Sequence, residues 1–119
     1  MESYKDLKVW QKSMMLVKEI YSVVKLLPKE ELFALSAQMR RATVSIPSNI
    51  AEGFGRNSPN EYVRFLNIAK SSSYELETQL NICLMLNYTS KEQILTALEL
   101  TDEIGKMITA LTKSLAPNI

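Results

Sequence analysis

The sequence predicts an all-α fold, an antiparallel up-down-up-down four-helix bundle formed by residues 1–119 as a single domain. Only three glycines and four prolines occur, and so few turn residues favour a few long helices over many short strands. Apolar residues recur at steps of three and four, the period of amphipathic helices. Short links near Pro28, Asn57 and Tyr88 make consecutive helices antiparallel neighbours.

The first helix is expected from about Asp6 to Leu27, and Pro28 ends it. It carries two apolar rows, which are Leu7, Trp10, Met14, Val17, Tyr21 and Val24, and Leu16, Ile20, Val23 and Leu27. Two rows are more than one seam of a bundle usually requires. The sequence therefore predicts a homo-oligomer.

The second helix is expected from Glu30 to about Gly53, although it contains the stretch SIPSNIAEGFGR. Its core positions keep steps of three and four straight through Pro47, namely Leu32, Leu35, Met39, Ala42, Ile46, Ile50 and Phe54. Because this register does not slip, we expect one helix kinked at Pro47, whose ring leaves the Thr43 carbonyl without its usual partner. Gly53 and Gly55 are expected to supply the permissive backbone with which the chain leaves the helix.

The third helix has the clearest start, with Ser58 as N-cap, Pro59 at the first helical position and Glu61 placed to complete a capping box. The small residues Ala69 and Ser73 on its core face would let a neighbouring helix approach closely. The expected core row is Tyr62, Leu66, Ala69, Ser73, Leu76, Leu80 and Cys83.

The fourth helix begins within the stretch TSKEQ, where Thr89 with Glu92 or Ser90 with Gln93 would form a capping box. It is expected to end before Pro117. Its predicted inward stripe is Ile94, Leu98, Thr101, Ile104, Ile108, Leu111 and Leu115.

Several classes of function lack the residues they need. Histidine is absent, and the single cysteine, Cys83, lies at core spacing. Glu75 and Glu77 stand two apart on a helix and face different ways. We therefore expect no enzyme, no metal or other cofactor and no small-molecule substrate. No signal-peptide pattern or apolar run of about 20 residues occurs, which predicts a cytoplasmic protein without membrane contact.

The candidate site is a set of arginines. All four, Arg40, Arg41, Arg56 and Arg64, fall in one region of the sequence, beside polar ridges predicted on the second and third helices. The flat guanidinium suits phosphates, carboxylates and buried interfaces. Glu52 and Glu61 lie in the same region and would form ion pairs with these arginines. Two interpretations stay open, a surface that contacts RNA or an RNA-processing protein, and a protein-binding scaffold with no affinity for nucleic acid.

The stretches DLKVWQKSMMLVKEIY, QMRRATVSIPSNIAEGFGRNS and EYVRFLNIAKSSSYELETQL resemble the 23S rRNA-intervening sequence family of four-helix bundles. The chain is also similar to the accessory protein of diversity-generating retroelements, which works with a reverse transcriptase and its RNA. The resemblance implies a ring-like homopentamer. Its central motif comprises Arg41, Ser45, Pro47, Asn49, Ile50, Ala51, Glu52, Gly53 and Arg56, and with Gly55 we interpret this stretch mainly as a structural device.

Overall fold

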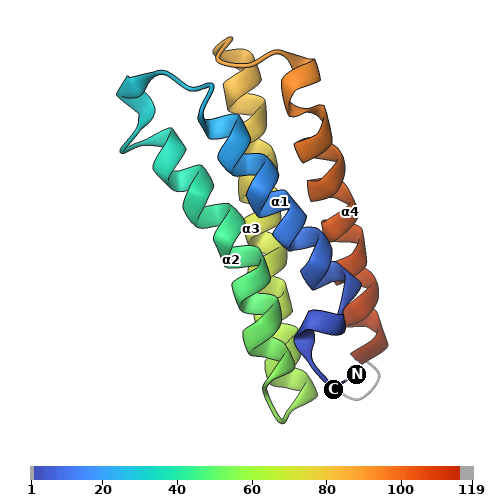
Figure 1. Ribbon diagram of the computed structural model, residues 1–119. Helices are drawn as coiled ribbons and strands as arrows, with labels where there is room; N and C mark the ends of the chain where they lie inside the picture. Colours follow the sequence, from blue (N-terminus) through green and yellow to red (C-terminus); the bar gives the residue numbers. More distant parts are fainter. Residues whose placement is uncertain (1, 116–119) are drawn as a thin grey trace.

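The computed structural model describes residues 2–115 and shows helices packed side by side with alternating direction (Figure 1). Each long helix packs against the next in the chain, and α1 also packs against α4, which closes the bundle. The molecule measures 46 × 23 × 22 Å. The predicted four-helix bundle is confirmed. Its elements are η1 (Tyr4–Asp6), α1 (Lys8–Val24), η2 (Lys29–Glu31), α2 (Leu35–Phe54), α3 (Pro59–Met85) and α4 (Lys91–Leu115).

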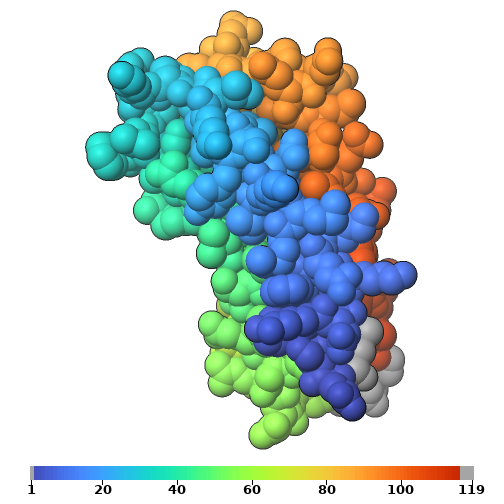
Figure 2. Space-filling view, viewed as in Figure 1, coloured from blue at the N-terminus to red at the C-terminus, as the bar shows by residue number. Residues whose placement is uncertain are grey.

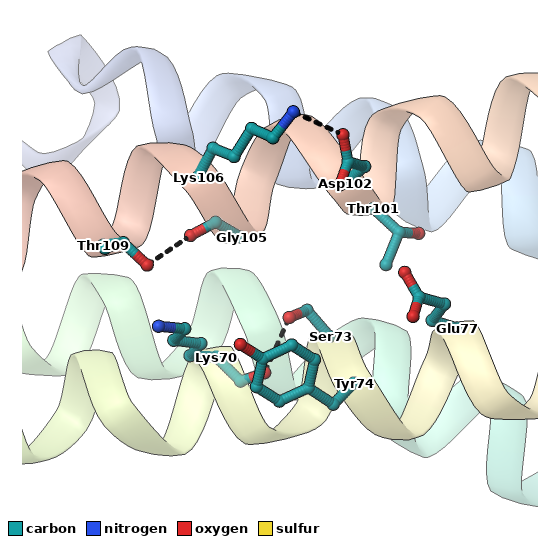
Figure 3. Close-up of a pocket in the computed structure, with 9 residues that line it drawn as sticks. All are labelled: Lys70, Ser73, Tyr74, Glu77, Thr101, Asp102, Gly105, Lys106 and Thr109. Carbon is teal, nitrogen blue, oxygen red and sulfur yellow. Dashed lines mark hydrogen bonds and ion pairs between the residues drawn. The ribbon is translucent and has the colours of Figure 1, made fainter.

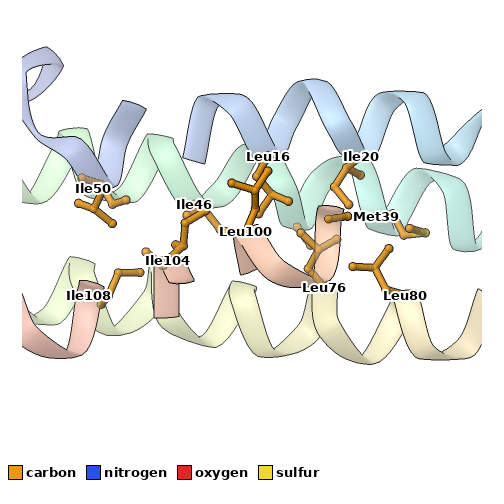
Figure 4. Packing of buried hydrophobic residues seen from close by; sticks show 14 of the residues in the cluster. Leu16, Ile20, Met39, Ile46, Ile50, Leu76, Leu80, Leu100, Ile104 and Ile108 are labelled. Atoms are coloured by element: carbon orange, nitrogen blue, oxygen red, sulfur yellow. The ribbon is translucent and has the colours of Figure 1, made fainter. Parts of the chain in front are cut away.

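The core runs along the bundle axis and takes side chains from every long helix (Figure 4). Its fully buried large residues include Leu16, Ile20, Met39, Ile46, Ile50, Leu66, Leu76, Leu80, Ile94, Ile104 and Ile108. Cys83 is buried among them, with its thiol 3.7 Å from the sulfur of Met39. Burial raises the pKa of this thiol to about 11, so it stays neutral near pH 7. The expectation of a buried, small apolar cysteine is confirmed.

Helix α1 is shorter than the predicted span from Asp6 to Leu27. Leu7 is extended, with φ −71° and ψ 124°, so α1 begins at Lys8 and ends at Val24. Of its two apolar rows, one supplies most of the residues that reach the core, since Leu16 and Ile20 are completely buried, while the other adds Leu7. The other row is largely a surface, because its members from Trp10 to Val24 are half-buried or exposed.

Helix α2 begins five residues later than predicted. The expected start at Glu30 is wrong because η2 forms a separate turn there and Ala34 has non-helical dihedral angles, φ −118° and ψ −104°. A Glu31 carboxylate oxygen accepts a hydrogen bond from the Leu35 backbone N–H at 3.3 Å, and this satisfies one free donor of the first turn. Leu32, which was expected in the core, is 48% exposed.

The helix is continuous through Pro47, as the unbroken register predicts. Ile46 and Ile50 on either side of it are fully buried, and Pro47 is buried with them. Because proline has no N–H, it cannot hydrogen-bond to the carbonyl four residues before it, that of Thr43. This helix therefore keeps a residue that weakens its own hydrogen bonding.

Replacing Pro47 by alanine is expected to raise the free energy of unfolding by about 1 to 2 kcal/mol. A proline inside a helix costs about 3 kcal/mol, and the alanine variant avoids this cost. It also loses the burial of two ring methylenes, which lowers the gain in stability by about 1.6 kcal/mol. Urea denaturation followed by circular dichroism measures the difference. Ser48→Ala, an exposed neighbour in the same helix, is the control and should change stability by less than about 0.5 kcal/mol. A destabilised Pro47→Ala variant would contradict the expectation.

The starts of α3 and α4 follow their predicted caps in part. The Ser58 hydroxyl accepts from the Glu61 N–H at 3.3 Å, but the Glu61 carboxylate binds Arg64 instead of completing the capping box. At α4 the Ser90–Gln93 box forms in both directions, at 2.8 and 3.2 Å. The alternative pair fails, because the buried Thr89 hydroxyl has no hydrogen-bond partner within the described part of the chain.

The predicted core rows of α3 and α4 are mostly buried, and a few positions differ. Tyr62, Leu98, Leu111 and Leu115 are only half-buried. The prediction missed further residues that are buried on these helices, which are Phe65, Ser72, Gln79, Ala97 and Leu100. Pro117 lies outside the described residues.

Candidate nucleic-acid or subunit interface

A polar groove runs between α2 and α3, where the two predicted polar ridges meet. Gln38, Arg41, Ser45, Ser72 and Glu75 line it. The Ser72 hydroxyl lies 2.9 Å from the Ser45 hydroxyl, which links the two helices by a hydrogen bond. The groove is therefore built on polar contacts between helices and does not expose an apolar core.

Two residues of the central motif, Ser45 in this groove and Asn49 one turn further along α2, act as structural groups. The Asn49 amide donates to the Ser45 carbonyl at 2.8 Å and to its hydroxyl at 2.9 Å. The Ser45 hydroxyl thus joins Asn49 and Ser72 in one network. Both donors of the Asn49 amide nitrogen point back into the helix, so we interpret the pair as a packing device.

Arg56 and Arg64 lie together at the α2–α3 turn, Arg56 in the link between these helices and Arg64 near the start of α3. The central carbon of each guanidinium is 4.7 Å from the centroid of the Phe65 ring, within the range of a cation–π contact. Phe65 itself is buried. A single aromatic ring from α3 therefore holds both guanidinium groups at one end of the bundle.

Each of these two arginines also has a carboxylate partner. Arg64 donates to both oxygens of Glu61, at 3.1 and 3.3 Å, and this hydrogen bonding lowers the pKa of Glu61 and raises that of Arg64. Arg56 lies 3.9 Å from Glu52, the predicted pair four residues apart. All four groups are substantially exposed, so these ion pairs contribute little to stability.

Gly53 permits the close contact on which this end of the bundle depends. A β-carbon placed there would lie 2.9 Å from Cβ of Phe65 and 3.0 Å from Cδ1 of Tyr62. The predicted reason for Gly53 and Gly55 is wrong, since neither has a positive φ in the described structure. Gly53 lies inside α2 and is needed for space, whereas a β-carbon at Gly55 would meet only carbonyl oxygens at 3.6 Å or more.

The structure divides the four arginines into two pairs. Arg40 and Arg41 line one surface near the start of α2, and Arg40 donates to the Leu32 carbonyl at 3.3 Å. Arg41 lies thirteen residues before the end of α2 at Phe54, or about 20 Å at 1.5 Å per helical residue, and Arg56 follows that end. Arg41 is exposed and forms no ion pair with any residue from 2 to 115.

A second surface lies between α1 and α2, and we call it the α1–α2 groove. It comprises Trp10, Met14, Val17, Tyr21, Val44 and Pro47, and Arg41 lies at one end of it. Figure 2 shows α1, in blue, running along α2, in green, on this side of the molecule. The groove is formed by the apolar row of α1 that the core does not use. The doubled row in the sequence was the signal for it, although it did not tell which row would stay outside.

A third recess lies between α3 and α4 and is lined by polar side chains (Figure 3). Two of its hydroxyls are already bound within their own helices, because Ser73 donates to the Lys70 carbonyl at 2.6 Å and Thr109 to the Gly105 carbonyl at 3.0 Å. Lys106 pairs with Asp102 at 3.0 Å. Ser73 faces Gly105, and a β-carbon placed at Gly105 would lie 3.8 Å from the Ser73 hydroxyl oxygen, an ordinary contact distance. Part of the recess is therefore taken up by contacts within the bundle itself.

The described residues form neither a metal-binding cluster nor a membrane-spanning helix. Within residues 2–115, no three histidine, cysteine or acidic side chains are grouped so that they would hold a metal ion. None of the helices in this part of the chain combines the length and the apolar character needed to span a bilayer.

Known proteins are similar to this chain in sequence and in fold. The family described as 23S rRNA-intervening sequence protein matches residues 5–110. The chain belongs to this family. A crystal structure of a protein of unknown function from the S23 ribosomal protein family of Bacteroides thetaiotaomicron is similar to this family member, with a TM-score of 0.82 and 28% identity. The match covers 88% of this chain and 98% of that one. A comparison with curated proteins gave no match.

Proposed function

We propose that this member of the 23S rRNA-intervening sequence protein family is a non-catalytic scaffold that assembles with copies of itself and presents arginines to RNA. The α1–α2 groove carries the proposal. Its exposed apolar side chains include Met14 and Val44, at 45% and 42% exposure, next to the half-buried Trp10. Contiguous apolar surface of this kind is typical of protein interfaces. The resemblance found in the sequence implies a pentamer.

RNA contact is proposed for Arg56 and Arg64 at the α2–α3 turn. Both guanidiniums are exposed and held over one ring, so they reach phosphates with little loss of side-chain freedom. A single subunit of net charge +1 would bind RNA weakly. Repetition of the pair around a closed oligomer raises the effective affinity, because each further contact is intramolecular.

The alternative is a scaffold without affinity for nucleic acid, and one observation favours it. Arg56 and Arg64 already have the carboxylates of Glu52 and Glu61 beside them, and these repel phosphate. In that case the arginines hold protein contacts, as the second interpretation of the sequence states.

An RNA-binding measurement on the double variant Arg56→Ala/Arg64→Ala separates the two functions. Under the RNA proposal, the slope of log affinity against log salt falls in magnitude by about 1 to 2 for each engaged subunit, while oligomer mass and helicity stay unchanged. Lys25→Ala/Lys91→Ala is the control, because it removes the same charge at the opposite end of the bundle. Wild-type protein that binds no structured RNA at low salt would reject the RNA function in favour of the scaffold.

A further inference from the structure

The segment between α1 and α2 carries an exposed apolar group that the bundle does not use. Phe33 is 92% exposed, and Leu26 and Leu32 beside it are 45% and 48% exposed. We call these three residues the apolar tip. The segment between α1 and α2 projects from the body of the bundle, in cyan at the upper left (Figures 1 and 2). A phenylalanine held in water forgoes the burial of roughly 150 Å² or more of surface.

The apolar tip is held in place by a hydrogen bond to another part of the bundle. A Glu31 carboxylate oxygen accepts from the Tyr88 hydroxyl at 2.8 Å, which ties the segment to the link between α3 and α4. This hydrogen bond raises the pKa of Tyr88. The other Glu31 oxygen accepts from the Leu35 N–H. Phe33 is therefore presented at a fixed place, pointing away from its own core.

The apolar tip and the α1–α2 groove also carry side chains of opposite charge. Glu30, beside the tip, is exposed and has no ion-pair partner among residues 2–115, and the same holds for Arg41 at the end of the groove. Glu30 and Phe33 are three positions apart, as are Arg41 and Val44. Each of these charges is thus near an apolar residue of its own surface, and the two charges are opposite, so a tip that enters the groove of a second copy can bring the Glu30 carboxylate to the Arg41 guanidinium.

We propose that the apolar tip of one copy docks in the α1–α2 groove of a second copy. Phe33 packs against Met14, Val17 and Val44, and the Glu30 carboxylate pairs with the Arg41 guanidinium. The inference rests on the self-association proposed above and names the segment that fills the groove. Because the tip and the groove are different patches, each copy offers both halves of the contact, and repeated head-to-tail contacts close into a ring when the rotation permits.

Sedimentation of single and paired variants tests this contact. Phe33→Ala should weaken association at least about 30-fold, as expected when a central aromatic anchor is removed. Glu30→Arg and Arg41→Glu should each weaken it about 10-fold by placing like charges together, and the double swap should restore most of the loss. Met85→Ala removes another exposed apolar side chain, 70% exposed and outside the tip and the groove, and should have no effect. All altered side chains are exposed or half-buried, so circular dichroism should show unchanged helicity.

The outcomes separate this inference from the proposed function. A wild-type oligomer whose mass and dissociation constant do not respond to Phe33→Ala overturns the tip contact but leaves self-association standing. Charge swaps that each weaken assembly without rescue in the double variant also overturn the Glu30–Arg41 pairing. A wild-type protein that stays monomeric at every accessible concentration overturns both proposals.

Discussion

Replacing Gly53 by valine is expected to lower the free energy of unfolding by about 3 kcal/mol, the upper end of the usual cost of overpacking. The added β-carbon would lie 2.9 Å from Cβ of Phe65, a distance that such atoms do not adopt, and the branched methyls would add to the clash. Phe65 cannot move its Cβ without moving α3. Urea denaturation of wild type and variant measures the loss.

Gly55→Ala is the matched control for this variant. Gly55 has φ −77° and ψ −4°, which any residue adopts, and a β-carbon there meets nothing closer than 3.6 Å. Alanine should leave stability unchanged or raise it by up to about 1 kcal/mol, since it reduces the freedom of the unfolded chain. Equal effects at the two glycines would show that the close approach of α2 and α3 does not depend on Gly53.

Gly53→Val is also expected to affect the candidate RNA site. Phe65 is the ring on which both Arg56 and Arg64 rest, so displacing it removes their shared support. The loss of stability at Gly53 and the arrangement of these arginines therefore depend on one close contact between helices. This explains why a glycine lies inside a helix where it lowers helix propensity.

Local chemistry explains which elements could be predicted from the sequence. The starts of α3 and α4 depend on residues three apart: Ser58 caps the Glu61 N–H as predicted, and Ser90 with Gln93 is one of the two capping boxes predicted for α4. The start of α2 depends in addition on Glu31, whose carboxylate binds Tyr88, a residue 57 positions away. A periodic pattern of apolar residues cannot reveal a contact between two residues so far apart in the sequence.

The site was harder to predict than the fold for a related reason. The arginines looked like one cluster because they are close in sequence, but the length of α2 places Arg41 about 20 Å from the helix end that Arg56 follows. The stacking of Arg56 and Arg64 on Phe65 could not be predicted from the sequence, because it depends on how α2 and α3 pack. The role of Gly53 likewise depends on a neighbouring helix and not on its own backbone.

Helix α1 gives a second test, because its two apolar rows look equivalent in sequence and have different surroundings in the fold. Ile20 is fully buried, whereas Met14 is 45% exposed in the α1–α2 groove. Ile20→Ala should lower the free energy of unfolding by about 2 to 5 kcal/mol, through lost transfer free energy and the cavity that remains. Met14→Ala should cost less than about 1 kcal/mol under conditions where the protein is monomeric.

The two variants should also differ in association, and this difference decides what the outer row is for. Removing Met14 takes away part of the groove in which a second copy is proposed to dock, so the dissociation constant should rise while helicity and monomer stability stay nearly unchanged. Ile20→Ala should unfold at lower urea at any concentration, because its side chain never meets solvent or a partner. Because binding stabilises only the folded form, the Met14→Ala deficit should grow with protein concentration as wild type assembles. A deficit that is large and independent of concentration would place Met14 in the core and would contradict the assignment of the outer row to an interface.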